Sequence, residues 1–378
     1  MQAYVYTDKS LARYAGRFVW LSLNTENSAN AKFLERYPIP ALPTILVLDA
    51  KRDTVTSRYV GGANVAQIRK LLDDAEKTYR VKGQSAADSL LAKADRLAAE
   101  GKNAEAAKAF EEAMANAPLK WSGYGRATES LLFSLTMNGD HERCATRALE
   151  IYPRVKGTPS AANVSAIGLS CAASLEETHA KRLSLVGELE KAAREVFKDA
   201  RILMSDDDRS GMYLALIEAR DAVKDEEGGK KLKAEWAAFL EDAAARAKTP
   251  EQRTVFDSHR VSAYLEVGTP EKAIPMLEQS ERDFPDDYNP PARLAGIYKV
   301  LKQYDKALAA SDRAMARVYG PRKLIVMNAR AELFVAMDDK KAARETLQQA
   351  IEYAKALPAG QRSERRIAML EKRLGELQ

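Results

Sequence analysis

The spacing of hydrophobic positions changes near residue 80. Before it, two short apolar runs at residues 17–23 and 44–50 are rich in β-branched and aromatic residues and are bounded by polar turns. Such runs are typical of buried strands. After it, apolar residues recur every three or four positions, which is the spacing of amphipathic helices. The pattern therefore predicts a small α/β region followed by a long all-α region.

The first eighty residues predict the element order β-α-β-β-α. A short helix is expected over residues 24–37, because Pro38 cannot continue it. Residues 54–60 alternate in polarity, as expected of a hairpin partner for the second apolar run. Residues 64–79 then predict an amphipathic helix with Asn64 as its N-cap. A right-handed crossover is expected between the first two strands.

Three stretches of this region resemble a thioredoxin-like domain. FVWLSLNTEN at 18–27 is similar to that family's central strand and acidic turn, IPALPTILVLDAKRD at 39–53 to its Val-x-x-x-Pro-Thr strand entry, and YVGG at 59–62 to the approach to its last helix. The resemblance implies a cis peptide bond between Leu42 and Pro43. It also implies that the backbone there pairs with an extended substrate, so Leu42 and Pro43 are the candidate docking residues.

The family's first strand and its Trp-Cys-x-x-Cys motif are absent from the sequence. Residues 1–16 are similar to the stretch that follows this motif in relatives, so one expectation is a chain that starts late, with the dithiol upstream of Met1. The other is a domain that kept its shape and lost its chemistry. Both leave residues 1–82, the expected thioredoxin-like domain, without the thiolate that thiol–disulfide exchange requires. No catalytic residue is expected in the chain as written.

A repeated spacing of small residues runs through the helical region. The small positions and a following proline recur at the same offsets in residues 100–118 and 267–285, and the small positions recur in 301–319 and 337–355. Two antiparallel helices cross closely only where small residues face each other. These stretches resemble the tetratricopeptide repeat, and residues 129–153 form a weaker fifth unit.

This second resemblance implies an all-α tetratricopeptide-type solenoid over residues 83–378. Its concave face would bind a protein or a peptide. The repeat is irregular in about 158–250, where we expect degenerate helical pairs, with a separate inserted helical domain as the alternative.

Composition and charge argue against several classes of protein. The formal net charge is +5 and no basic tract stands out, so nucleic-acid binding is not expected. No run of 18 apolar residues occurs, so no membrane span is expected. Cys144 and Cys171 match neither a Cys-x-x-Cys pair nor a zinc spacing, and buried free thiols are expected. The three histidines are scattered, and the acidic run at 205–210 is explained by helix capping, so neither a metal nor a cofactor is expected.

The leading hypothesis is a protein-interaction module, redox-silent as written, that binds protein or peptide clients in the solenoid groove. The alternative is a thiol–disulfide oxidoreductase with client-selecting repeats, if a Cys-x-x-Cys pair lies upstream of Met1. The N-terminal residues lack the pattern of a signal peptide, so the chain as written is expected in the cytoplasm. A secreted or periplasmic location is expected instead if a signal peptide lies upstream. The sequence does not predict an oligomeric state.

Overall fold

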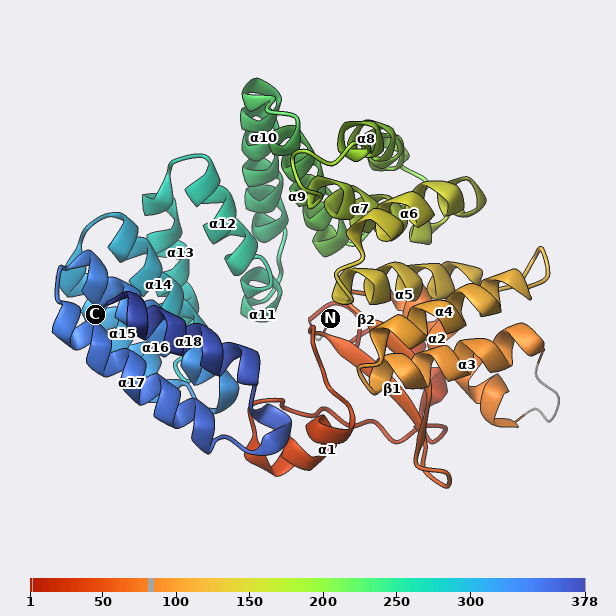
Figure 1. The fold of residues 1–378 in the computed structure, drawn as a ribbon, viewed down its shortest axis with the longest axis horizontal. Helices are drawn as coiled ribbons and strands as arrows, with labels where there is room; N and C mark the ends of the chain where they lie inside the picture. Colours follow the sequence, from red (N-terminus) through yellow and green to blue (C-terminus); the bar gives the residue numbers. More distant parts are fainter. Residues whose placement is uncertain (2, 81–84, 378) are drawn as a thin grey trace. The chain divides into compact units, whose positions relative to one another are not determined.

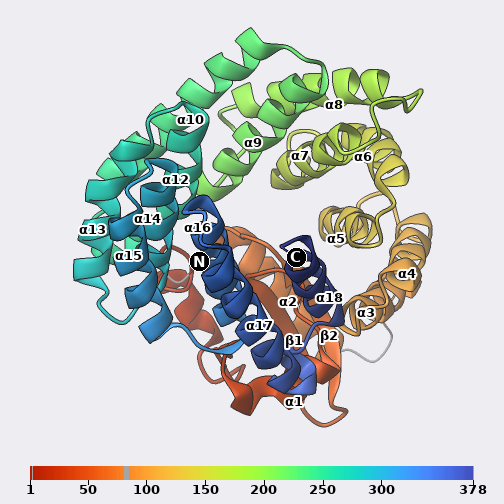
Figure 2. The same ribbon diagram turned by 60° about the vertical axis from the view of Figure 1, so that its left-hand side comes forward.

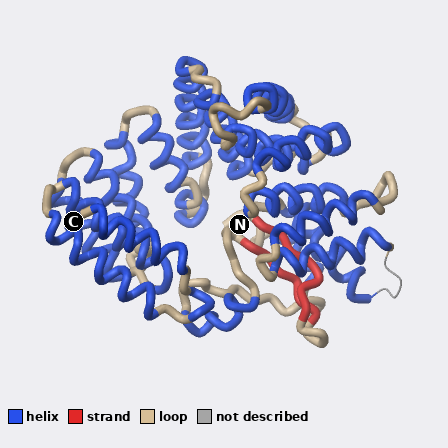
Figure 3. Tube along the Cα trace, in the orientation of Figure 1, coloured by secondary structure: helices blue, strands red, loops and turns tan. Residues whose placement is uncertain are grey.

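The computed structural model describes residues 1, 3–80 and 85–377, so the expected boundary between residues 82 and 83 lies outside the described residues. Two strands and a long series of helices make up the described chain (Figures 1 and 3). They form two compact units. The first comprises Met1–Arg17 and Ile39–Trp236, and the second comprises Phe18–Pro38 and Ala237–Gln378.

The first unit contains an antiparallel hairpin of β1 (Thr44–Asp49) and β2 (Thr54–Val60), followed by α2 (Val65–Arg80). The register shifts between Val47 and Leu48. The helix buries one face of its amphipathic pattern against the hairpin, as the sequence predicts. The order β-β-α expected for residues 44–79 is therefore confirmed.

The other helices of the first unit pack mainly on their neighbours along the chain (Figure 1). Their bounds are α3 (Ala86–Ala99), α4 (Asn103–Ala115), α5 (Tyr124–Met137), α6 (His141–Val155), α7 (Pro159–Ala173), α8 (Arg182–Lys198) and α9 (Asp206–Ala222). Helix α10 (Glu226–Ala245) crosses the division between the two units. A short 3-10 helix, Lys9–Tyr14, precedes the hairpin.

The second unit is helical throughout its C-terminal part. Its helices are α11 (Pro250–Thr254), α12 (Asp257–Glu266), α13 (Ala273–Asp283), α14 (Asn289–Val300), α15 (Tyr304–Arg317), α16 (Lys323–Ala336), α17 (Lys340–Ala356) and α18 (Glu364–Glu376). Short 3-10 turns lie at Pro270–Lys272, Gly320–Arg322 and Ala359–Gln361. None of the described helices in either unit combines the length and apolar composition needed to span a membrane.

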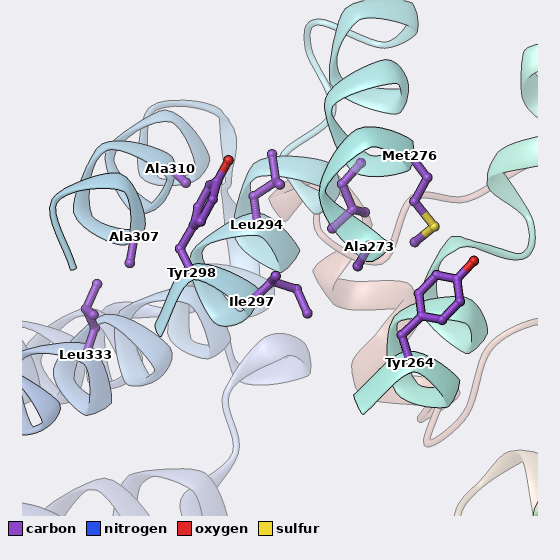
Figure 4. Close-up of a cluster of buried hydrophobic side chains, with 10 residues drawn as sticks. Tyr264, Ala273, Met276, Leu294, Ile297, Tyr298, Ala307, Ala310 and Leu333 are labelled. Carbon is purple, nitrogen blue, oxygen red and sulfur yellow. The ribbon is translucent and has the colours of Figure 1, made fainter. Parts of the chain in front are cut away.

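The small positions of the repeats are buried, as the sequence predicts. Ala106, Ala273, Ala307 and Ala343 have no exposed surface. Between them lie the larger side chains, and one such cluster joins Tyr264, on α12, to residues of α13–α16 (Figure 4). Small residues thus let paired helices approach, while leucines and tyrosines fill the space between successive pairs.

The predicted first strand is wrong. Residues 18–23 form no strand, and Val19 is 88% exposed (Figure 3). The predicted helix at 24–37 is reduced to a 3-10 turn, Ser28–Asn30, and the short α1 (Ala31–Arg36), although it ends before Pro38 as expected. The β-α-β crossover of a thioredoxin-like domain is therefore not seen among the described residues.

The physical reason lies in what this segment contacts. Helix α1 packs on the 3-10 turn Ala359–Gln361, where Gln361 donates a hydrogen bond from Nε2 to the carbonyl of Thr25 at 2.8 Å. Gly360 approaches the backbone of Ala31 so closely that a Cβ there would overlap its carbonyl oxygen. An apolar run becomes a strand only when another strand pairs with it, and residues 18–38 instead form part of the C-terminal unit.

Candidate functional site

The strongest candidate site is a cavity on α14 and α16 in the second unit. Helix α14 places Leu294, Ile297 and Tyr298 in the core and contributes Asn289, Ala292, Arg293, Ala295, Gly296 and Lys299 to the lining of the cavity. On helix α16, Leu333 belongs both to this core cluster and to the lining of the cavity. Helices α14 and α16, which contact each other, therefore line a shared space.

The cavity has a volume of about 300 Å³. Its lining combines apolar and small side chains with cationic and neutral polar ones. The lining residues are Tyr288, Asn289, Ala292, Arg293, Ala295, Gly296, Lys299, Ser311, Arg322, Ile325, Val326, Ala329, Arg330 and Leu333. Four of them are cationic and none is a carboxylate. The lining can therefore hold an apolar group and an anionic group together.

Three of the four cations are paired with acids from outside the lining. Lys299 Nζ lies 3.0 Å from Glu332, and Arg330 Nη1 lies 2.6 Å from Asp312. These partners hold the two side chains in place at the edges of the cavity.

Arg322 is held from two sides. Its backbone N–H donates to Glu26 Oε2 at 2.7 Å, and its Nη1 donates to the hydroxyl of Tyr288 at 3.1 Å. Glu26 belongs to the segment that sequence analysis assigned to a thioredoxin-like domain. In the structure this segment supports the wall of the cavity.

Arg293 differs from the other three cations. Among the described residues it makes no recorded hydrogen bond or ion pair, although it is partly buried. Burial lowers the pKa of its guanidinium, and the charges of Asp257 and Asp287 oppose this shift. A desolvated cation without a hydrogen-bonded partner is unfavourable in isolation, and an anion in the cavity would relieve it.

The inner face of the first unit is covered by the chain's own hairpin. Strand β2 packs on α3 and α5, where Tyr59 donates from its hydroxyl to Glu129 at 3.2 Å. Arg126 donates from Nη1 to the carbonyl of Arg58 at 3.2 Å and to Asp95 at 2.6 Å. These contacts leave β2 fixed on the helices that correspond to α14 and α16 in the second unit.

Burial changes the pKa values of the carboxyl groups in this contact. Burial raises the pKa of Glu129, and hydrogen bonds from Ser160, Asn163 and Tyr59 act in the opposite direction. Burial likewise raises the pKa of Asp95, opposed by Arg126. The hairpin contact is thus built from carboxyls that are largely removed from solvent.

The predicted docking residues, Leu42 and Pro43, lie in the first unit immediately before β1. Their peptide bond is cis, as the thioredoxin-like resemblance implies. The side chain of Leu42 is exposed, and the carbonyl of Pro43 accepts a hydrogen bond from Gly61 at 2.9 Å. Strand β1 has β2 as its neighbour in the described two-stranded sheet. The cavity residues, which sequence analysis missed, belong to the other unit.

The cysteines do not form the expected free thiols. Cys144 on α6 and Cys171 on α7 are joined by a disulfide, with their Cα atoms 6.1 Å apart. The two helices lie side by side (Figure 2), which brings together residues 27 apart in the sequence. Their nearly equal distances from the turn at Gly157 are the sequence signal that would have predicted this pairing. No group of three or more potential metal-binding side chains occurs among the described residues.

Residues 288–356 match the model of the tetratricopeptide repeat. No curated protein matches the chain. Three solved structures are similar to it, each at a TM-score below 0.5. A tetratricopeptide repeat protein from Parabacteroides merdae is 11% identical, with a TM-score of 0.49, and the match covers 78% of this chain and 100% of that one.

The second is a thermophilic tetratricopeptide repeat protein from Thermus thermophilus, 16% identical with a TM-score of 0.26, covering 77% of this chain and 98% of that one. The third is an assembly chaperone of RpL4, 16% identical with a TM-score of 0.36, covering 77% and 97%. At these scores none of them defines the arrangement of this chain. The matched residues 288–356 contain α14–α17, so the cavity is built on tetratricopeptide repeats.

Proposed function

We propose that the C-terminal repeats are a protein-interaction module that holds an extended peptide segment of a partner in the cavity on α14 and α16. The observation that carries this proposal is the cavity itself, about 300 Å³ of space lined by two tetratricopeptide helices. Ile325 lines it and is 55% exposed, so apolar surface is available for contact. Tetratricopeptide repeats present such faces to proteins and peptides.

The first unit supports the proposal with an internal precedent. There an extended segment, β2, lies on the inner helices and is held by the arginine and carboxylate side chains of α3 and α5. The same kind of helix pair in the second unit has a cavity where the first has a strand. An extended chain from a partner is the ligand with the matching shape.

The proposal is tested by selecting peptides from a random display library on the full chain. Ala329 lines the cavity and is exposed, so Ala329→Trp fills the space without disturbing the core. The matched control is Ala309→Trp, an exposed position of α15 outside the lining. We expect selected peptides to lose binding to the first variant and keep it with the second. Peptides that bind both variants equally, or no selected peptides at all, would contradict the proposal.

A second docking site is proposed at Leu42 and Pro43. The supporting observations are the exposed side chain of Leu42 and the position of both residues at the start of β1, whose recorded neighbour is β2 alone. A peptide strand can extend such an edge by backbone pairing. Peptides that survive Ala329→Trp but are lost with Leu42→Asp would identify this site. If every selected peptide depends on the cavity, this second site is not used.

The thiol–disulfide oxidoreductase remains the alternative function for this N-terminal region. Both cysteines of the chain are joined to each other, so the chain offers no free thiol as a nucleophile. Reduction of insulin by this chain above the dithiothreitol background would favour the enzyme. We propose instead that the disulfide is structural and that the protein works in an oxidising compartment, outside the cytoplasm expected from the sequence.

A further inference from the structure

We infer that residues 18–23 of one copy of this chain pair with the open edge of β1 in a second copy, so that the protein forms a dimer. The open edge is the one that β2 does not occupy. The inference rests on the second site of the proposed function, the edge that begins at Leu42 and Pro43, and it names the occupant of that edge. It does not use the cavity on α14 and α16.

Residues 18–23 form a run of exposed apolar side chains. Val19 and Leu21 are 88% and 79% exposed, and Trp20 and Leu23 are 50% and 40% exposed. Among the described residues, no backbone hydrogen bond is recorded for residues 19–23. The run is rich in aromatic and β-branched residues, which favour strands. A contiguous apolar patch of this kind is typical of a contact surface, whereas single exposed apolar residues are ordinary.

Strand β1 has the composition of an interior strand although one of its edges is open. Its residues 45–48 are Ile, Leu, Val and Leu, so apolar side chains point to both faces of the sheet. The sheet of the described chain consists of β1 and β2. Natural proteins usually protect such edges with charges or proline, whereas Asp49 is the only charged residue of β1. A further strand is therefore expected on this edge.

The run and β1 are complementary when they are aligned antiparallel. Arg17, directly before the run, then lies opposite Asp49, and Ser22 lies opposite Thr44. A parallel alignment that places Phe18 opposite Thr44 would instead place Ser22 opposite Leu48. The antiparallel alignment thus joins opposite charges at one end, polar residues at the other, and apolar residues between them. The apolar pairs are Phe18–Leu48, Val19–Val47, Trp20–Leu46 and Leu21–Ile45.

A second copy of the chain is the partner that this complementarity identifies. Within one copy the run is not part of the described sheet, and the residues after it bond to the second unit through Thr25 and Glu26. Arg17 bonds to Glu76 of its own copy at 3.0 Å and would lie near two carboxylates in the dimer. When two copies exchange their runs about a twofold axis, the contact is made twice and buries on the order of 1,000 Å², the lower limit for a stable interface.

The inference is tested first by the mass of the full chain in solution. Size-exclusion chromatography with light scattering over about 1–100 μM protein should show a dimer in equilibrium with the monomer. Leu21→Glu places a charge among the apolar pairs, and we expect the dimer dissociation constant to rise at least about tenfold. Leu119→Glu, at a position 85% exposed in the first unit, is the matched control and should leave it unchanged. A chain that stays monomeric, or equal effects of the two substitutions, would overturn the inference.

Cysteine cross-linking shows whether the paired segments come from different copies. Leu21→Cys and Ile45→Cys are made as separate proteins and mixed, because facing Cβ atoms in an antiparallel pair are about 4.5–5.5 Å apart. Mild oxidation of the mixture should give a cross-linked dimer, and Leu119→Cys in place of Leu21→Cys should give none above background. A chain that carries both substitutions should also give a cross-linked dimer. A cross-linked monomer from that chain would show pairing within one copy and would overturn the inference. Circular dichroism of each variant confirms that the helices are retained.

The failure of this inference is distinguishable from the failure of the second proposed site. If the chain is monomeric and selected peptides are lost with Leu42→Asp, the edge binds the strand of another protein and only the inference fails. If the dimer forms and no selected peptide depends on Leu42, the inference holds and the edge is not a site for other peptides.

Discussion

The two units of this protein use similar helix pairs in different ways. In the first unit, α3 and α5 carry Asp95, Arg126 and Glu129, and these side chains bind the chain's own hairpin. In the second unit, α14 and α16 carry Arg293 and Arg330 around an open cavity. The helical framework is therefore compatible with either a fixed internal strand or an available site. The side chains on the inner helices decide between the two.

Two ion pairs make this difference measurable. Arg126 and Asp95 lie 2.6 Å apart with side chains 10% and 0% exposed, whereas Arg330 and Asp312 lie at the same distance with side chains 22% and 64% exposed. The distance between the charged atoms is the same in the two pairs, but the exposure of the side chains to solvent differs. The comparison separates the effect of burial from the effect of distance.

The largest expected effect is that of Asp95→Ala, which removes the carboxylate of the buried pair. Arg126 and the buried Arg58 then lose their counter-charge, and we expect the free energy of unfolding to fall by about 4 kcal/mol. Asp312→Ala, at the exposed pair, should cost less than about 1 kcal/mol. Urea unfolding followed by circular dichroism measures both. Similar losses for the two variants would show that the hairpin contact is no more buried than the edge of the cavity.

The next largest expected effect is the loss of stability when the disulfide between Cys144 and Cys171 is reduced. Closing a loop of this length, with a sequence separation of 27, stabilises a folded chain by about 3.5 kcal/mol in the chain-entropy model. Dithiothreitol should therefore lower the unfolding midpoint of the first unit and leave that of the second unchanged, as followed by hydrogen exchange of peptides from each unit.

The control for this prediction is the double variant Cys144→Ser and Cys171→Ser. Its midpoint should be the same with and without dithiothreitol, because no disulfide remains to be reduced. Titration of thiols in the denatured, unreduced protein gives an independent result. Two reactive thiols in that titration would restore the expectation of free cysteines and remove the difference between the units.

The sequence predicted the features that depend on local spacing. The small positions Ala106, Ala273, Ala307 and Ala343 are all buried, because a helix that repeats its pattern presents the same face to its neighbour in every repeat. The hairpin and its following helix were predicted for the same reason. Alternation in residues 54–60 and the amphipathic pattern after Asn64 are both visible within a few residues.

The features that were missed depend on partners distant in the sequence. Residues 18–23 have the composition of a strand, but strand formation requires an edge to pair with, and the adjoining segment packs on the turns near Gly320 and Gly360 instead. The importance of Arg293 could not be predicted because it rests on the absence of an ion-pair partner among the described residues.

The smallest expected effect is a difference in how the two units respond to pH. Burial raises the pKa of Glu129 above its usual value near 4.3, so its contribution to stability is complete below that value and is lost as the pH rises through the raised pKa. Hydrogen bonds from Arg313 and Arg317 lower the pKa of Glu281, against the effect of burial. Its contribution is therefore present above about pH 4.3 and is lost as the pH falls through the lowered pKa.

Glu129→Gln and Glu281→Gln should therefore change the pH profile of stability in opposite directions. Relative to the unsubstituted protein, Glu129→Gln gains stability as the pH rises from 4 to 7, because the amide carries no charge to be desolvated. Glu281→Gln is the less stable variant at neutral pH, and its deficit shrinks on acidification below about pH 4. Urea unfolding at a series of pH values measures both differences. Parallel profiles for the two variants would show that the carboxyl under the hairpin is as well solvated as the one in the second unit, and the contrast between an occupied and an open inner face would then rest on the cavity alone.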